Sequence, residues 1–108
     1  MHKPAKQTQL DILEKWLREN NYNFERIDEV EIRDVMGRIL SADRHQIIVS
    51  TVAGRRLWDA ICQRGSMGYR DGLLEIMGTI VDPEKAHGKV EGWLKASDVI
   101  ARLGGGVV

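Results

Sequence analysis

Apolar residues near the N-terminus recur at the spacing of one helix face. Those on this stripe or beside it are Leu10, Leu13, Leu17, Ile12 and Trp16. Thr8 and Asp11 form a T-x-x-D capping box, which satisfies backbone N–H groups that lack a partner at a helix start. Asn20 and Asn21 can take the left-handed conformation that ends a helix. The pattern therefore predicts a helix over residues 8–20.

A second helical stripe lies near the C-terminus, where Ala96, Val99, Ile100 and Leu103 follow an i, i+3, i+4, i+7 spacing. Gly104 can end this helix, and Arg102 suits the negative end of its dipole. The pattern predicts a helix over residues 95–103.

Between these helices, alternating or β-branched segments indicate strands. Residues 22–27 alternate aromatic or apolar with polar side chains, and residues 45–52 are rich in Ile and Val. Residues 55–63 carry bulky side chains on both faces, which is typical of a central strand. Residues 73–81 fit either a strand or a short helix followed by a strand, and the strand is favoured.

Two segments are less regular. Residues 28–44 begin with an acidic stretch, and their later part, 35–42, fits a short strand, a turn of helix or a mobile loop. Residues 90–94 indicate a short strand, in which Gly92 marks a close approach or a bulge.

This order of elements is typical of an α+β fold. We expect a small antiparallel β-sheet of about three to five strands, with the N-terminal and C-terminal amphipathic helices packed on one face. By this interpretation residues 8–103 form a single α+β domain. A flexible arm over 1–7 precedes it and a flexible glycine-rich tail over 104–108 follows it.

Composition and charge narrow the class of protein. The chain is 43% hydrophobic and 30% charged, as in soluble globular proteins. Its 16 basic and 16 acidic residues cancel, which argues against a dedicated nucleic-acid binder. No apolar run is long enough to span a membrane, and no signal peptide begins the sequence. The single cysteine, Cys62, fits a reducing compartment, so we expect a cytoplasmic protein.

The segment RGSMGYRDG, residues 64–72, is the strongest candidate for a site. Its glycines, followed by no Gly-Lys-Ser/Thr, match neither a phosphate-binding loop nor a dinucleotide-binding motif. The loop could cradle an anion with backbone N–H groups and added side-chain donors, or present an exposed face to a partner. The plainer interpretation, a hairpin loop that needs positive φ angles, is favoured. The candidate binding residues are Arg55, Arg56, Arg64, Gly65, Ser66, Gly68, Tyr69 and Arg70.

Charge is divided unevenly along the chain. Residues 54–70 hold four arginines against one aspartate, a local charge of +3, whereas residues 25–34 hold five acids against two arginines, a local charge of −3. Such a division can steer a charged partner. Two solvated faces that pair with each other explain it equally simply, and this second interpretation is favoured.

Aromatic residues offer a further candidate surface. Trp58, Trp93 and Tyr69 could stack on a base or anchor an interface. Core packing is the better interpretation for Trp16 and Trp58. Tyr69, between glycines and beside Arg70, is predicted to be the exposed aromatic.

Catalytic and metal-binding signatures are absent from the sequence pattern. Cys62, His45 and Asp59 contain the parts of a thiol nucleophile site, but a mid-strand cysteine is more simply a buried structural thiol. The histidines lie far apart without ligand spacing, so no metal site, cofactor or catalytic residue is predicted.

Two segments, WDAICQRGSMGYRDGLLEIMGTIV and VEGWLKASDVI, resemble stretches of small phage- and prophage-encoded proteins of Gram-positive bacteria. The resemblance covers roughly the C-terminal half and brings no catalytic residues with it. It implies an accessory protein that acts inside a bacterial host, in the host cytoplasm.

The sequence leaves three functions open, with an enzyme the least favoured class. The first is a non-enzymatic module that binds a protein partner through the glycine-rich segment 64–72, with Arg64, Tyr69 and Arg70 as contacts. The second is a binder of a small phosphate-bearing ligand that uses the same loop and the nearby Arg55 and Arg56. The third, weaker, is a single-stranded nucleic-acid binder with an exposed Trp58 as stacking platform. The sheet edges and three methionines, Met36, Met67 and Met77, leave a homodimer open.

Overall fold

The structure, a computed structural model, describes residues 8–104 and confirms the α+β class. The flexible arm predicted for 1–7, and all of the predicted tail except Gly104, lie outside the described residues. The elements are α1 (Gln9–Glu19), β1 (Phe24–Glu29), β2 (Ile32–Arg33), β3 (Ile39–Ser41), β4 (Arg44–Ser50), β5 (Arg56–Ile61), the 3-10 turn η1 (Tyr69–Asp71), β6 (Leu74–Gly78), β7 (Val90–Leu94) and α2 (Ala96–Arg102).

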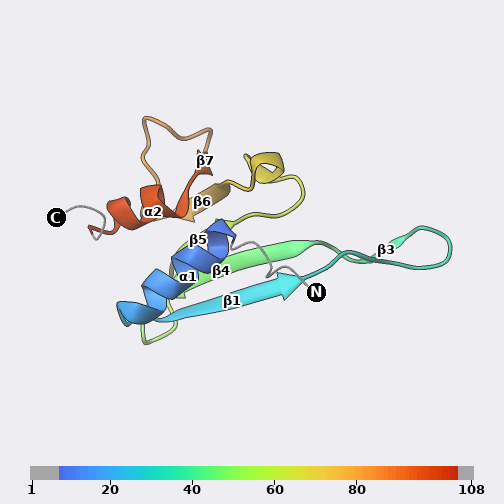
Figure 1. Ribbon diagram of the computed structural model, residues 1–108, viewed down its shortest axis with the longest axis horizontal. Helices are drawn as coiled ribbons and strands as arrows, with labels where there is room; N and C mark the ends of the chain where they lie inside the picture. The colour runs from blue at the N-terminus through green and yellow to red at the C-terminus, as the bar shows by residue number, and fades with distance from the viewer. Residues whose placement is uncertain (1–7, 105–108) are drawn as a thin grey trace, which may run out of the picture.

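Five strands form one antiparallel sheet in the order β1-β4-β5-β6-β7, and β2 and β3 form a separate two-stranded ribbon (Figure 1). The prediction that the Arg55–Gln63 segment is a central strand is confirmed, because β5 lies in the middle of the sheet. The open choice for residues 73–81 is decided in favour of a strand, since β6 covers Leu74–Gly78.

Both helices lie on the same face of the sheet, with α1 over β4 and α2 against α1 and β7 (Figure 1). The register places apolar residues of neighbouring strands opposite each other on that face, as in the pairs Val49–Trp58 and Ile47–Ala60. The buried apolar residues are Leu10, Leu13, Leu17, Ile47, Val49, Trp58, Ala60, Leu74, Ile76, Leu94, Ala96 and Val99. Burying one large aliphatic side chain contributes about 1.5–3 kcal/mol, so this core stabilises the fold.

Helix α1 begins and ends as its sequence predicts. The Thr8 Oγ1 accepts from the backbone N–H of Asp11, and the Asp11 carboxylate accepts from the backbone N–H of Thr8. Asn21 follows the helix with φ 59°, in the left-handed region.

An ion pair between Arg102 and the buried Glu91 holds helix α2 against the sheet. Arg102 donates two hydrogen bonds to Glu91 of β7, at 2.7 and 2.6 Å, and a third to the carbonyl oxygen of Ile80 at 2.9 Å. Glu91 also accepts from the backbone N–H of Asp82. Its bonds with Arg102 hold the pKa of the Glu91 carboxyl below its usual range. The carboxylate thus joins the helix to the long β6–β7 connection.

Residues 28–44, left undecided by sequence, form the ends of β1 and β4 and a projecting hairpin between them. We define the projecting hairpin as residues 30–43, which include β2 and β3 and extend away from the sheet (Figure 1). Asp34 folds its tip, because one carboxylate oxygen accepts from the backbone N–H groups of Met36 and Arg38. Gly37 completes the turn with φ 83°.

Candidate partner-binding site at the glycine loop

The glycine loop, residues 62–73, connects β5 to β6. Gly65, Gly68 and Gly72 have φ angles of 93°, 88° and 70°, a region that other residues adopt at a cost. Gly68 and Gly72 flank η1, so the two glycines fix where Tyr69 and Arg70 are presented. The predicted requirement for positive φ in this loop is confirmed.

Hydrogen bonds within the fold use most of the donors that an anion cradle would need. Backbone N–H groups of the loop donate to carbonyl or carboxylate oxygens at Arg64, Ser66, Met67, Tyr69, Asp71, Gly72 and Leu73. The Ser66 hydroxyl donates to the carbonyl oxygen of Gln63 and accepts from the Gln63 backbone N–H. The backbone and Ser66 therefore serve mainly to fold the loop, and an anion would have to rely on the arginine side chains.

Trp93 of β7 lies against this loop. The sequence offered it as a possible contact aromatic but did not place it among the candidate binding residues. Trp93 is 53% exposed, compared with 41% for Tyr69, the aromatic predicted to be exposed. Its φ of 55° is unusual for a bulky residue, and it falls where the β6–β7 register shifts. The close approach predicted at Gly92 is confirmed, since a Cβ there would overlap Met67.

Trp93 and the glycine loop together line a hollow of about 630 Å³. Tyr69, Arg64 and Arg70 line it together with Trp93. Gly68 allows the close contact at its base, because an added Cβ would lie 3.1 Å from Cα of Trp93 and 2.9 Å from Cβ of Leu73. The structure thus brings together the loop residues predicted from the sequence and adds a tryptophan to them.

A second hollow of about 600 Å³ lies on the other side of Tyr69 and Arg70. Leu10, Cys62 and His45 are among its lining residues. Tyr69 and Arg70 line both hollows, so η1 forms a ridge between them. Arg70 makes no ion pair within residues 8–104, which leaves its guanidinium available at this ridge.

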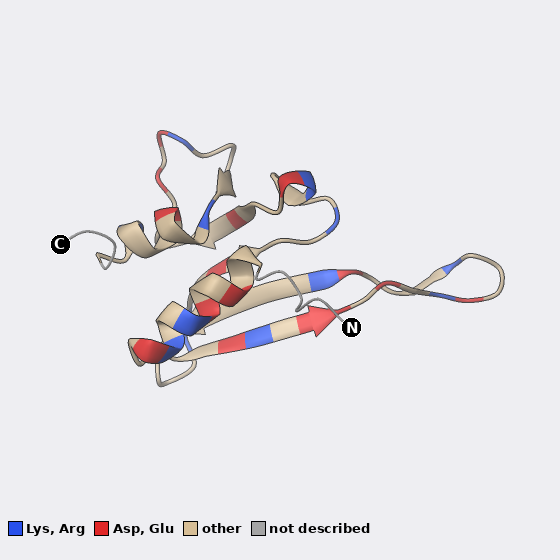
Figure 2. Cartoon of the chain, viewed as in Figure 1, with Lys and Arg blue, Asp and Glu red and all other residues tan. Residues whose placement is uncertain are grey.

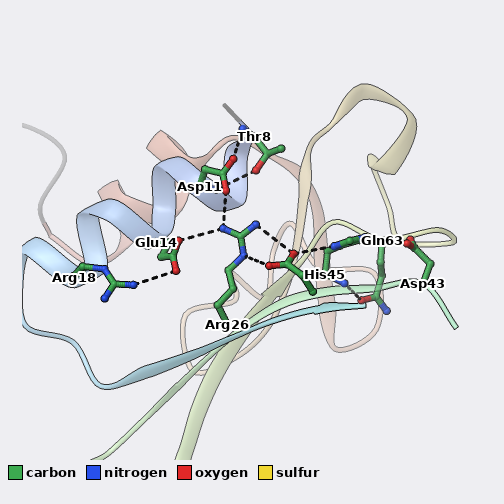
Figure 3. Close-up of polar contacts among 9 residues, drawn as sticks. Thr8, Asp11, Glu14, Arg18, Arg26, Asp43, His45 and Gln63 are labelled. Carbon is green, nitrogen blue, oxygen red and sulfur yellow. Dashed lines mark hydrogen bonds and ion pairs between the residues drawn. The ribbon is translucent and has the colours of Figure 1, made fainter. Parts of the chain in front are cut away.

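His45 joins the glycine loop to the base of the projecting hairpin (Figure 3). Its Nδ1 lies 2.9 Å from Oδ1 of Asp28, and its Nε2 lies 2.9 Å from Oδ1 of Asp43. The bond with Asp28, and then that with Asp43, raises the pKa of the His45 imidazole above its ordinary 6.5. A protonated ring can donate to both carboxylates at once, whereas a neutral ring can donate to one.

The same cluster extends to the loop backbone and to helix α1. The Arg64 backbone N–H donates to Asp43 at 2.9 Å, which holds the pKa of that carboxyl below its usual range. On the other side, Arg26 contacts Asp28 at 3.1 Å and Asp11 of α1 at 2.7 Å (Figure 3). These ion pairs form a continuous polar path from the start of α1 to the glycine loop.

Arg55 and Arg56 do not belong to this site, and their predicted nearness to the loop is wrong. They precede and begin β5, whereas Arg64 follows the other end of that strand. The extended strand separates them by its whole length. Arg56 instead pairs with Asp59 at 2.9 Å.

The basic and acidic segments meet in part, as the favoured interpretation predicted. Arg64 pairs with Glu31 of the projecting hairpin at 3.4 Å. Charges of both signs are interspersed over the sheet, α1 and the hairpin (Figure 2). The separation of charge along the sequence is therefore not matched by a separation of charge on the molecule.

Two sequence candidates lose their physical basis. Trp58 is 3% exposed in the core, so the hypothesis that it forms an exposed stacking platform is wrong. Burial raises the pKa of the Cys62 thiol, which opposes the thiolate that a nucleophile requires.

In the described part of the chain, no group of three or more His, Cys, Asp or Glu side chains is arranged to hold a metal ion. None of the helices of residues 8–104 is long and apolar enough to cross a membrane.

Comparisons of the chain with models of known protein families, with curated proteins and with solved structures give no match.

Proposed function

We propose that this protein is a non-enzymatic module that binds a protein partner through the hollow between the glycine loop and Trp93. The exposed indole of Trp93, held at φ 55° beside a hollow lined by Tyr69 and Arg70, is the observation that carries the proposal. Backbone strain at an exposed bulky residue occurs mainly where function requires it. Trp, Tyr and Arg are also the residues most enriched among the energetic centres of protein interfaces.

The fold holds the backbone of the site in a fixed conformation, which favours binding. Loop hydrogen bonds and the Gly68 contact hold Tyr69, Arg70 and Trp93 in place before a partner arrives. Preorganised side chains lose less entropy on association, so more of the contact energy remains as affinity. The partner surface that fits combines an apolar side chain for the hollow with an acidic group for Arg70.

The resemblance of the C-terminal half to small phage and prophage proteins suggests where to search for this partner. In that setting the module would act in the cytoplasm of a bacterial host, as an accessory or regulator of a host protein. The partner is then sought among soluble bacterial proteins with an acidic and apolar contact surface.

A small phosphate-bearing ligand is a second candidate, favoured by one observation. Arg64 and Arg70 line the same hollow, and Arg70 has no ion pair within residues 8–104. The loop N–H groups already donate within the fold, so such a ligand would be held by guanidinium groups and its binding would weaken strongly with salt.

The first experiment selects binding peptides or host proteins against the wild-type protein and measures their affinities by calorimetry. Trp93→Ala and Tyr69→Ala/Arg70→Ala should each reduce affinity by 2 kcal/mol or more, about the range of interface hot spots. Arg55→Ala/Arg56→Ala is the matched control, because it removes two arginines at the opposite end of β5. Equal affinity in all variants would show that the hollow is not the contact surface.

A thermal-shift series with nucleotides and inorganic phosphate separates the two candidates. A ligand at about 100 times its dissociation constant stabilises by about 2.7 kcal/mol. A shift that disappears in Arg64→Ala/Arg70→Ala would favour the phosphate-bearing ligand. Unchanged midpoints, together with peptide binding that depends on Trp93, would favour the protein partner.

A further inference from the structure

Strand β1 forms one edge of the sheet, and no segment in the described part of the chain pairs with its outer side (Figure 1). Its pairing with β4 is antiparallel and runs along the whole strand without a register shift. The backbone groups of successive residues in such a strand point alternately toward the neighbour and away from it. The Ser50 N–H donates to the carbonyl oxygen of Asn23, so the backbone groups of Phe24, Arg26 and Asp28 point outward. β1 therefore presents a regular row of backbone donors and acceptors to a further strand.

The opposite edge of the sheet, β7, is irregular. Trp93 interrupts its backbone with φ 55°, and its register with β6 shifts. His87 and Val90 bond to each other where this strand begins. Bulges and short, irregular strands are devices that prevent the addition of a strand at a sheet edge. β1 has no such interruption, so its outer side is the edge at which a strand can be added.

The side chains of β1 alternate between the two faces of the sheet. Arg26 contacts Asp11 of α1 at 2.7 Å, so Glu25, Ile27 and Glu29 lie on the face opposite the helices. Glu25 and Glu29 are exposed, and neither makes an ion pair in the part of the chain that the structure describes. On that face the edge carries two unpaired carboxylates with an apolar side chain between them.

The basic residue nearest in register does not neutralise these carboxylates. Arg44 lies opposite Glu29 in β4 but donates to Gln46 at 2.9 Å. Opposite charges on directly facing residues stabilise paired strands, and like charges destabilise them. An added strand with Lys or Arg opposite Glu25 and Glu29 is therefore favoured. A nucleic acid or an anionic lipid surface, which is recognised through basic groups, does not fit this edge.

A second copy of β1 does not fit the edge either. In a two-fold dimer that continues the sheet, residues directly opposite each other belong to the same face. Each register that overlaps at least half of the strand then places like charges opposite each other. These pairs are Glu25 with Glu25, Arg26 with Arg26, Glu25 with Glu29, or Asp28 with Asp28, depending on the register. The edge therefore discriminates against its own copy and in favour of a basic strand.

We propose that β1 accepts an extended segment of a partner protein as an added antiparallel strand, with basic side chains opposite Glu25 and Glu29. Main-chain hydrogen bonds to the outward backbone groups supply affinity, and alternate side chains supply specificity. The pattern that fits is basic-x-apolar-x-basic, because Ile27 lies between the two glutamates on the same face. This edge is separate from the Trp93 hollow, which lies beside β7 on the other side of the sheet.

The probe is the peptide Thr-Lys-Thr-Ile-Thr-Lys-Thr with blocked ends, titrated into the full chain at low salt and followed by NMR. Strand addition should slow amide exchange at Phe24, Arg26 and Asp28, because their outward N–H groups gain acceptors. The same peptide N-methylated at its threonines keeps its charges but lacks the donors that face β1, so it should not bind. Equal binding of the two peptides would reduce the contact to electrostatic attraction and overturn the proposal.

Variants of the protein test the charge pairing. Glu25→Gln/Glu29→Gln should weaken peptide binding about three- to tenfold, since two cross-strand charge pairs are lost. Glu84→Lys changes the net charge by the same amount at an exposed position of the β6–β7 connection, so it should bind as wild type does. Unchanged exchange in β1 at millimolar peptide, or an equal loss of binding in the double variant and in Glu84→Lys, would overturn the proposal. Trp93→Ala should bind this peptide normally, so failure here and failure of the proposed partner site are distinguishable.

Discussion

The body of the molecule and the projecting hairpin use apolar residues in opposite ways. In the body, Leu13 and Ile76 are fully buried between the helices and the sheet. In the hairpin, Val35 and Met36 stand in solvent at the tip, and the structure is held by backbone bonds and by ion pairs such as Asp34–Arg38. Both regions contain β-strands, yet one is stabilised by burial and the other by local polar contacts.

The two regions therefore contribute unequally to the stability of the fold. Exposed ion pairs contribute about 0–1 kcal/mol, whereas each buried large side chain contributes about 1.5–3 kcal/mol. We therefore expect the body to be stable without help from the hairpin. Changes in the body should lower the free energy of unfolding strongly, and changes in the hairpin should lower it only slightly.

The largest expected effect comes from the core. Leu13→Ala should lower the free energy of unfolding by about 4 kcal/mol, because it leaves a cavity at a fully buried position between α1 and the sheet. Val35→Ala, the matched change in the hairpin, should alter it by less than about 0.5 kcal/mol. Urea denaturation at low micromolar concentration measures both. Similar losses in the two variants would mean that the hairpin is part of the cooperative core.

A somewhat smaller effect should follow loss of the Glu91–Arg102 pair. Glu91→Gln should destabilise by about 3 kcal/mol, near the low end for a broken buried pair, because Arg102 is still partly exposed. Glu19→Gln, which breaks the exposed pair with Lys15 at 3.9 Å, is the control and should cost below about 0.5 kcal/mol. Glu91→Leu/Arg102→Leu removes both charges and should recover much of the stability lost in Glu91→Gln. If stability is not recovered, the pair stabilises the fold beyond compensating its own two charges.

Periodicity predicted the body well because packing there follows from local pattern. The 3.6-residue stripes of Leu10–Leu17 and Ala96–Leu103 became α1 and α2, and the bulk on both faces of residues 55–63 placed β5 in the centre. The hairpin escaped prediction because its apolar residues are not buried. The sequence of residues 35–42 fits a short strand, a turn of helix or a mobile loop, and no buried face distinguishes among the three.

The sequence predicted the loop residues of the candidate site but did not include Trp93 among them. Gly65, Gly68 and Gly72 require positive φ, and a sequence shows this directly. Trp93 lies at the same hollow, beside the register shift between β6 and β7. Gly92 indicated a bulge or a close approach at this point, but the sequence did not show which loop Trp93 would meet. Arg55 was placed near the loop by sequence distance, although an extended strand carries the chain away from it.

A moderate effect is expected at the contact that supports the site. Gly68→Ala should cost about 2 kcal/mol, through a φ of 88° and contact with Leu73 and Trp93. Gly65→Ala has a similar φ of 93° but open space around it, so it should cost about 1 kcal/mol. Thermal unfolding measures the stabilities of both variants. Equal losses of stability in the two variants would show that Leu73 and Trp93 move aside for the new methyl group without destabilising the fold.

The smallest effect concerns the junction of the two regions, where His45 bridges Asp28 and Asp43. Because the folded-state pKa of His45 is raised, its contribution to stability is complete below the unfolded value of 6.5 and is lost as pH rises through the higher folded value. Half-exposed Asp28 keeps this contribution below about 1 kcal/mol. The neighbouring charges of Arg26, on Asp28, and of Arg64, beside Asp43, do not titrate in this range.

The effect should be local, since a neutral imidazole releases one of the two carboxylates at the base of the hairpin. Amide exchange, corrected for its intrinsic pH dependence, should therefore quicken in the projecting hairpin as pH rises through the raised pKa of His45, while the core strands stay protected. His45→Gln should remove this dependence, and His87→Gln, which alters an exposed histidine far from Asp28 and Asp43, should retain it. If protection falls equally in hairpin and core, the two regions unfold together, and the hairpin is not a separate unit of stability.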